Sequence, residues 1–403
     1  MIRIEEALKI IEKEIKILGL EEKDLLAAIG RVLGEDIRSM DNLPPFDKSA
    51  MDGYAIKYQD TQNCSINDRA ELNIKGIIKA GDFCEEELQF GDAYKIMTGA
   101  PIPIGANAVI EIEKAELDEN KLYVSQPVKE GNHIIRFGEE IKVGDIALNK
   151  GKVIRPSEIG FLASLGISSV KIYKSAVIAL IITGSELIDI DSELQKGKIR
   201  NSNEYSLKAL IKNLHAECLS LGITSDEKSL LKEKVKYALR NADIVVSSGG
   251  ASVGQYDFVK EVLIDIGAEV KFSNVAIKPG KPVTFATYNG KLFFALPGNP
   301  ASLITTFQEF VKPAIEKMMG KIITDDEEFQ VVLMDDFKAK QGRRKYIYVQ
   351  IKKEKGTYYA YKVGSQCSNH LKTMSQANGM IILPEDCGTV HAGEVVKGKF
   401  IFK

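Results

Sequence analysis

The stretch ADIVVSSGGASVGQYDF, residues 242–258, decides the fold expected for this chain. A strand is expected over 243–246, where Ile244-Val245-Val246 form an apolar, β-branched run, and a glycine-rich loop then leads into an expected helix over 258–266. Strands that alternate with helices in this way build parallel sheets covered by helices. The stretch therefore predicts an α/β domain with this loop at the carboxyl edge of its sheet, where open α/β sheets bind ligands.

The alternation continues around this stretch from about residue 173 onward. A strand is expected over 176–182 and helices over 204–214 and 226–240. Asn289-Gly290 joins two apolar runs in the manner of a β-hairpin turn, so at least one antiparallel pair is expected. The predicted sheet is therefore mixed, although mostly parallel.

The segments before residue 173 and after Gly320 have a different sequence pattern. Residues 3–18 carry apolar side chains at helical spacing, which predicts an amphipathic helix. Short β-rich runs separated by Gly, Pro and Asn fill 43–172 and the segment after Gly320. Because 403 residues exceed one typical domain, the sequence predicts a multidomain protein of the α/β plus β class.

Composition restricts the classes of function. Charged residues make up 27% of the chain, its net charge is -2, and no apolar run has the length of a membrane span or the form of a signal peptide. We therefore expect a cytoplasmic protein that binds neither nucleic acid nor membrane through bulk charge. The five cysteines are scattered singly and none of the four histidines has the spacing of a helical zinc site. A metal ion would have to use carboxylates.

The segment Gly250-Ala251-Ser252-Val253-Gly254 matches the G-x-S-x-G nucleophile elbow of hydrolases. In an elbow the strand enters the first glycine directly, whereas here residues 247–249 intervene. The histidines downstream, His370 and His391, lie in the expected C-terminal β domain. A loop whose backbone N–H groups bind phosphate is the better interpretation.

Two other expected strands end in similar loops, Thr183-Gly184-Ser185-Glu186 and residues 296–302, in which Asn299 can cap a helix that begins at Pro300. Residues 278–282, Lys-Pro-Gly-Lys-Pro, hold two lysines on a stiffened turn that suits an anion. Glu186, Asp226 and Asp257 could serve Mg²⁺ beside phosphate oxygens, although Asp226 fits a helix N-terminal charge equally well.

The order of these segments resembles the molybdopterin molybdenumtransferase family, which is related to the E domain of gephyrin. The resemblance spans essentially the whole chain and rests on PPFDKSAMDGYA (44–55), IMTGAPIP (96–103), TGSEL (183–187), SSGGASVGQYDF (247–258), AIKPGKP (276–282) and LPGNPAS (296–302). It implies a transferase of molybdenum cofactor biosynthesis. Such an enzyme accepts adenylylated molybdopterin, cleaves its phosphoanhydride with Mg²⁺, inserts molybdate into the pterin dithiolene and releases AMP.

The resemblance also implies an architecture. The subunit would have a discontinuous N-terminal linker and dimerisation domain (1–42 and 141–172), an inserted β domain (43–140), an α/β molybdopterin-binding domain (173–321) and a C-terminal β-barrel-like domain (322–403). Two subunits would form an elongated homodimer. The upstream adenylyltransferase is a further expected partner.

Site residues follow from the matching positions. The catalytic residues implied are Asp257, Asp226, Glu186, Asp52, Thr98 and Glu140, of which Asp257, Asp226 and Glu186 would hold the metal. The residues implied to bind pterin, nucleotide or molybdate are Thr183, Gly184, Ser248, Gly249, Gly250, Ser252, Gly254, Lys278, Lys281, Pro297, Gly298, Asn299, Pro300, Ser302, Arg343 and Ser368.

The chain departs from the family pattern at four places. Glu140 stands where aspartate is common, Asn274 and His370 where basic residues are frequent, and Arg344-Lys345 where an apolar and an acidic residue are usual. Three rival functions stay open: a molybdopterin adenylyltransferase, a non-catalytic pterin-binding scaffold, and, least favoured, a serine hydrolase.

Overall fold

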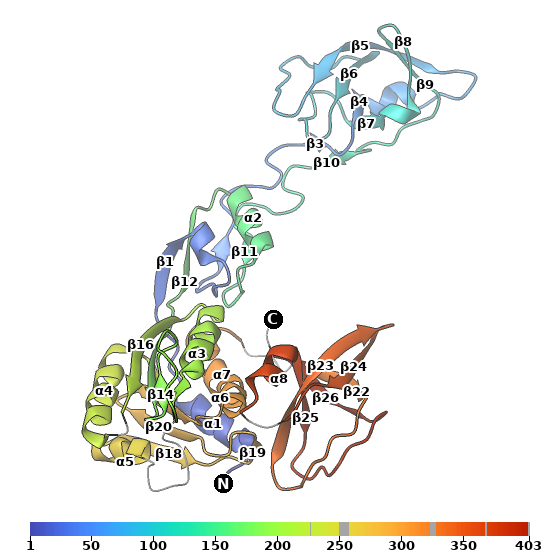
Figure 1. The fold of residues 1–403 in the computed structure, drawn as a ribbon. Helices are drawn as coiled ribbons and strands as arrows, with labels where there is room; N and C mark the ends of the chain where they lie inside the picture. Colours follow the sequence, from blue (N-terminus) through green and yellow to red (C-terminus); the bar gives the residue numbers. More distant parts are fainter. Residues whose placement is uncertain (226, 250–257, 323–327, 367–368, 402–403) are drawn as a thin grey trace. The chain divides into compact units, whose positions relative to one another are not determined.

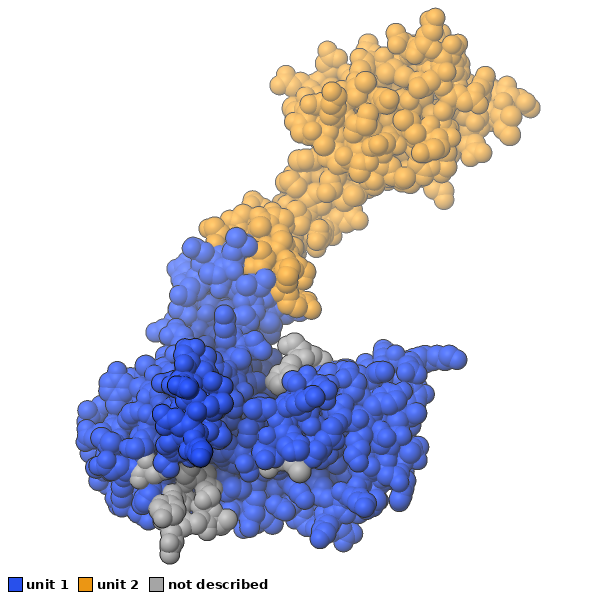
Figure 2. All heavy atoms as spheres, viewed as in Figure 1, with its two compact units in different colours: residues 1–34, 151–154, 170–403 blue, residues 35–150, 155–169 orange. Residues whose placement is uncertain are grey.

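The computed structural model describes residues 1–225, 227–249, 258–322, 328–366 and 369–401. The chain separates into two compact units, coloured separately in Figure 2. Unit 1 contains residues 1–34, 151–154 and 170–403, and unit 2 contains residues 35–150 and 155–169. The expected division into four domains is finer than these two units and stays a prediction.

A six-stranded mixed sheet forms the centre of unit 1 (Figure 1). Its order is β16 (Glu217–Thr224), β13 (Val177–Thr183), β17 (Ile244–Ser248), β21 (Lys291–Leu296), β20 (Thr284–Tyr288) and β18 (Glu269–Ser273). The first four strands run parallel and the last two pair antiparallel. Asn289 and Gly290 both have positive φ, 49° and 79°, as a two-residue hairpin turn requires. The predicted mixed sheet and its hairpin are confirmed.

Alternating side chains along the strands feed two hydrophobic cores, one on each face of the sheet. On one face Ile178 and Val246 pack with α1 (Ile4–Glu14), α3 (Ser202–Asn213), α6 (Pro300–Thr306) and α7 (Lys312–Met318). On the other face Ala179 and Val245 pack with α4 (Lys228–Asn241) and α5 (Phe258–Asp265). Short elements complete the region: β1 (Leu20–Asp24), η1 (Leu25–Ala28), β12 (Ser169–Tyr173), β14 (Leu187–Ile188), β15 (Ile199–Arg200) and η4 (Phe307–Val311).

Several expected boundaries differ from the structure by two or more residues, and two of them have a clear structural cause. The N-terminal helix ends at Glu14 rather than Leu18, because Ile15 turns to extended backbone and the N–H of Leu18 donates to the Met318 carbonyl at 2.8 Å. Strand β17 continues through Ser248, two residues beyond the expected end, because Ser247 and Ser248 pair with both β13 and β21. Tertiary pairing therefore overrides the local sequence signal at both places.

The C-terminal part of unit 1 is a small closed barrel. Its strands are β22 (Phe329–Leu333), β23 (Arg344–Glu354), β24 (Thr357–Lys362), β25 (Gly379–Leu383) and β26 (Val395–Phe400), closed by the β23–β25 pairing. The short β19 (Ile277–Lys278) joins one edge of β23, and α8 (Leu371–Gln376) precedes β25. Ile347 and Val349 fill the barrel core, whereas Tyr348 packs outward on the α/β core.

Unit 2 contains the predicted β domain. Its six-stranded sheet has the order β7 (Ala108–Glu111), β4 (Gly53–Ile56), β6 (Asp92–Ile96), β5 (Ala70–Ile78), β9 (Lys121–Val124) and β8 (Glu116–Asp118). The remaining elements are β2 (Ile37–Arg38), β3 (Lys48–Ser49), η2 (Tyr58–Thr61), η3 (Ile112–Lys114), β10 (Ile134–Ile135), β11 (Ile146–Leu148) and α2 (Pro156–Ser164). Across the described parts of both units, no helix has the length and apolar character that a membrane span needs.

Candidate active site

Three neighbouring strands, β13, β17 and β21, end side by side. Their backbones are in contact at these carboxyl ends. Gly249 donates its N–H to the Leu296 carbonyl at 3.3 Å. A Cβ on Gly249 would lie 2.3 Å from the Thr183 carbonyl oxygen, and a Cβ on Gly298 would lie 3.6 Å from the Gly249 Cα. The structure thus brings together Thr183, Gly249 and Gly298 at the edge where open α/β sheets bind ligands. The two glycines leave room beside these strand ends, and loops at such an edge can present N–H groups to a phosphate.

Asn203, at the start of α3, ties two of these strand ends together. Its amide Nδ2 donates to the Gly298 carbonyl at 2.7 Å and to the Ser248 Oγ at 3.0 Å, and the residue is buried. The side chain of Asn201 caps the same helix by accepting from the Glu204 N–H at 3.2 Å. The cap fixes the helix start and so places the Asn203 amide between the loops. The sequence does not predict this role for Asn203, because the Asn-Ser-Asn segment at 201–203 indicates only the start of a helix.

Replacing Asn203 by alanine should raise KM for the ligand of this edge about tenfold and lower Tm. The change removes the donor to the buried Ser248 hydroxyl, which costs roughly 1–2 kcal/mol when left unpaired, and the donor to the more exposed Gly298 carbonyl. Steady-state kinetics and thermal denaturation would measure both effects. Asn213→Ala, an exposed position at the other end of α3, is the matched control; equal effects from both variants would show that Asn203 does not position the loops.

Glu186 follows β13 at the same edge. Its carboxylate folds back over Gly184, where a Cβ would lie 2.8 Å from each carboxylate oxygen, and the side chain is exposed. Among the residues the structure describes, it forms no ion pair, and no group of three or more acidic, Cys or His side chains is placed to hold a metal ion. The other two predicted metal ligands, Asp226 and Asp257, lie outside the described residues. One carboxylate at this edge fits Mg²⁺, which needs only one or two beside phosphate oxygens.

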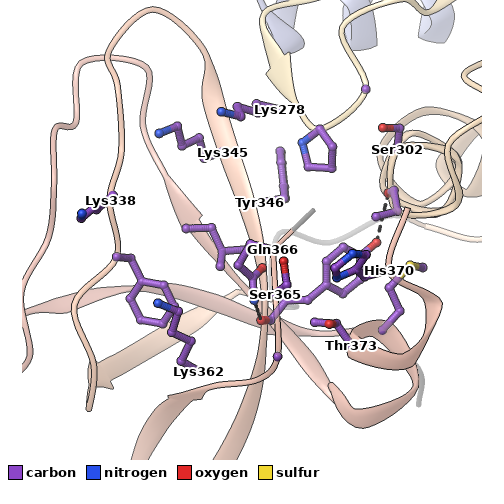
Figure 3. A pocket seen from close by; sticks show the side chains of 18 of the residues that line it. Lys278, Ser302, Lys338, Lys345, Tyr346, Lys362, Ser365, Gln366, His370 and Thr373 are labelled. Atoms are coloured by element: carbon purple, nitrogen blue, oxygen red, sulfur yellow. Dashed lines mark hydrogen bonds between the residues drawn. The ribbon is translucent and has the colours of Figure 1, made fainter. Parts of the chain in front are cut away.

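A cavity of about 980 Å³ opens between the barrel and the α/β part of unit 1 (Figure 3). It is strongly cationic, with Asp336 as the one carboxylate among its described lining residues. That carboxylate already accepts from the Ala392 N–H at 2.9 Å and lies 3.4 Å from His391. The lysine and arginine side chains that line the cavity are Lys278, Lys281, Lys338, Arg343, Lys345 and Lys362.

The cavity includes the predicted residues Lys278, Lys281, Ser302 and Arg343. The turn that carries the two lysines packs against α6, because Gly280 has φ +113° and a Cβ there would lie 2.4 Å from a methyl group of Thr306. The segment 296–302 links the cavity to the strand ends, since Gly298 contacts Gly249 and Ser302 lines the cavity. Within this segment Pro297 lies between Leu296, whose carbonyl accepts from the Gly249 N–H, and Gly298. Asn299 is the N-cap residue of α6 ahead of Pro300, but its side chain makes no capping hydrogen bond.

In unit 2 the structure joins Asp52 to Thr98. The Asp52 carboxylate accepts from the Thr98 N–H and from its Oγ1, both at 2.7 Å, and these hydrogen bonds lower the pKa of Asp52. Glu140 lies on a separate segment, where its N–H donates to the Leu43 carbonyl at 2.9 Å. Asp47, which the sequence analysis left unassigned, accepts from Arg136 Nη1 at 2.7 Å and orders the loop before Glu140.

Several predicted residues lie outside the described part of the chain: Asp226, Gly250, Ser252, Gly254, Asp257 and Ser368. Their roles stay predictions. The longer β17 also weakens one argument against a nucleophilic Ser252, since only Gly249 separates the strand from Gly250. Both downstream histidines lie in the C-terminal barrel region, where His370 lines the cavity and His391 lies beside Asp336.

Comparison with known proteins agrees with this geometry. Residues 2–166 match the MoeA N-terminal region (domain I and II), residues 179–317 a probable molybdopterin binding domain, and residues 330–399 the MoeA C-terminal region (domain IV). The molybdopterin molybdenumtransferase of Haemophilus influenzae is 37% identical over 93% of this chain and 92% of its own length. The chain belongs to the molybdopterin molybdenumtransferase family.

Further members support this assignment. The molybdopterin molybdenumtransferase of Staphylococcus epidermidis is 35% identical over 98% of this chain and 94% of its own. The crystal structure of the molybdopterin biosynthesis moeA protein from Pyrococcus horikoshii OT3 superposes with a TM-score of 0.85 at 33% identity, over 99% of this chain and 100% of that one. The protein is therefore a transferase with a role in molybdenum cofactor biosynthesis, and the predicted fold class is confirmed.

Proposed function

We propose that this molybdopterin molybdenumtransferase family member inserts molybdate into the dithiolene of adenylylated molybdopterin. In this proposal Mg²⁺-dependent cleavage of the phosphoanhydride accompanies insertion and releases AMP. The observation that carries the proposal is the cationic cavity beside three convergent strand ends. A tetrahedral oxyanion needs Lys, Arg and N–H donors, whereas the pterin dithiolene itself supplies the soft sulfur ligands for the metal.

Each group of residues has a task in this reaction. The loops that follow β13, β17 and β21 would hold the pterin phosphate through their N–H groups. Lys278, with Arg343, would hold molybdate in the cavity near the dithiolene. Mg²⁺, when bound by Glu186 with Asp226 and Asp257, would neutralise the phosphate oxygens of the phosphoanhydride.

The remaining expectations extend the proposal. Asp52, Thr98 and Glu140 would act at the same reaction, contributed by the second subunit of a homodimer. The proposal also includes contact with the upstream adenylyltransferase and a cytoplasmic location. The size of purified protein in solution tests the dimer directly.

The reaction itself gives a test by ligand removal. Wild-type protein incubated with adenylylated molybdopterin, Mg²⁺ and molybdate should release one AMP for each pterin that gains molybdenum. Chelation of Mg²⁺ should stop AMP release, and omission of molybdate should stop metal incorporation. Chromatography of the nucleotide and elemental analysis of the pterin measure the two products. Absence of AMP release under all conditions would refute the proposal, and ATP consumption with metal-free pterin would assign the adenylyltransferase reaction instead.

A further inference from the structure

Lys345 is a buried cation at the mouth of the barrel. It is only 7% exposed and lines the cationic cavity. In the parallel β19–β23 pair it lies directly opposite Lys278, so the two side chains share one face of the sheet. Figure 3 shows them extending side by side in the same direction. Two ammonium groups therefore converge on one part of the cavity wall.

Nothing in the described part of the chain neutralises Lys345. Its ammonium makes no ion pair or hydrogen bond there, whereas the preceding Arg344 points to the other face and pairs with Glu5 and, at 3.2 Å, with Glu385. The charged and titratable groups that influence Lys345 come from three segments: Lys278 on β19, Lys340 and Arg343 before β23, and the Cys387 thiol after β25. A buried charge that lacks a partner is costly, which favours an anionic ligand as its partner.

We infer that Lys345 is an additional oxyanion-binding residue, and that its ammonium joins Lys278 and Arg343 around one tetrahedral dianion. The inference rests on the proposed function, which makes that dianion molybdate. It adds to that function a donor at a position where an acidic residue is usual in the family.

The surroundings of Lys345 predict a proton coupled to binding. Burial, followed by the positive charges of Lys278, Arg343 and Lys340, lowers the pKa of Lys345 in the free protein. A bound dianion would raise this pKa again, because it favours the charged ammonium. Oxyanion affinity should therefore be complete below the lowered pKa and decline as pH rises through it, and binding in this range should take up protons.

The test is isothermal titration calorimetry with sodium molybdate and sodium tungstate on the full-length protein. At neutral pH, Lys345→Gln should weaken binding about tenfold, the value of one hydrogen bond to a charged group. Lys345→Arg should keep affinity within about threefold, because arginine keeps the positive charge. Lys352→Gln, an exposed position on the same strand, is the control and should bind as wild type does.

Proton uptake separates oxyanion contact from a structural role. Titrations at alkaline pH in two buffers of different ionisation enthalpy should show more proton uptake by wild type than by Lys345→Arg, because arginine does not titrate. Thermal denaturation of Lys345→Gln should give an unchanged or higher Tm, since the change removes an unpaired buried charge.

The inference fails if Lys345→Gln binds both oxyanions as tightly as wild type, or if wild type binds neither. These outcomes are distinct from failure of the proposed function, which AMP release by wild type decides. A protein that binds molybdate through Lys345 but never releases AMP would keep the site and lose the proposed reaction.

Discussion

Replacing Gly249 by alanine should reduce kcat/KM for AMP release about a thousand-fold, which corresponds to roughly 4 kcal/mol of lost transition-state stabilisation. Gly249 has φ +93°, and a methyl group there would lie 2.3 Å from the Thr183 carbonyl oxygen and 2.8 Å from the Thr183 Oγ1. The Thr183 carbonyl belongs to the backbone of β13 and cannot move without disturbing that strand, so the loop after β17 must leave its position. Steady-state kinetics with adenylylated molybdopterin would measure the loss.

The control for Gly249→Ala is Gly222→Ala. Gly222 also has positive φ, +64°, but a Cβ there meets no atom within 4 Å. Both variants carry the backbone strain of alanine in the left-handed region, of order 1–3 kcal/mol, and only Gly249→Ala carries the steric clash. Oxyanion binding should survive in Gly249→Ala, since Gly249 does not line the cationic cavity. Near-normal turnover of Gly249→Ala would exclude the strand ends as the pterin-phosphate site.

The layers of unit 1 could be predicted from the sequence because their signals are local. Apolar runs such as 176–182 and 243–246 have strand length and lie between helical patterns. The Asn289-Gly290 pair specifies the turn that makes the sheet mixed, and the structure has the positive φ values that this turn needs. The sequence alone therefore predicts that the loops after these strands lie at the carboxyl edge of the sheet.

The contacts that build the candidate site could not be predicted in the same way. Asn203 bridges residues 45 and 95 positions away in sequence, and neither its spacing nor its type distinguishes it from a helix cap. In the sequence Lys345 belongs to a run of three basic residues, 343–345. Its burial and its position opposite Lys278 depend on the pairing of β19 with β23. Such long-range pairings are set by how the chain folds as a whole. The family resemblance marked Lys345 only as a departure.

Replacing Glu186 by glutamine should lower kcat/KM at limiting Mg²⁺ about a hundred-fold. In the proposed reaction its carboxylate is a metal ligand, and glutamine keeps its size and shape but removes its charge. Loss of one group that stabilises developing charge in a transition state costs on the order of 100-fold or more. If the role is metal binding, the Mg²⁺ concentration for half-maximal AMP release should rise, and high Mg²⁺ should restore part of the rate. The measurement is AMP release across a Mg²⁺ titration.

Glu193→Gln is the matched control for Glu186→Gln. Glu193 is an exposed glutamate in the next connection, between β14 and β15, so its replacement changes the net charge equally without removing a carboxylate from the β13 edge. Long-range electrostatics would affect both variants alike, and salt would screen that effect because both groups are exposed. A shifted Mg²⁺ titration in Glu186→Gln alone would therefore assign the effect to direct coordination. Equal Mg²⁺ titrations in the two variants would remove Glu186 from the metal site and leave Asp226 and Asp257 as the carboxylates to test.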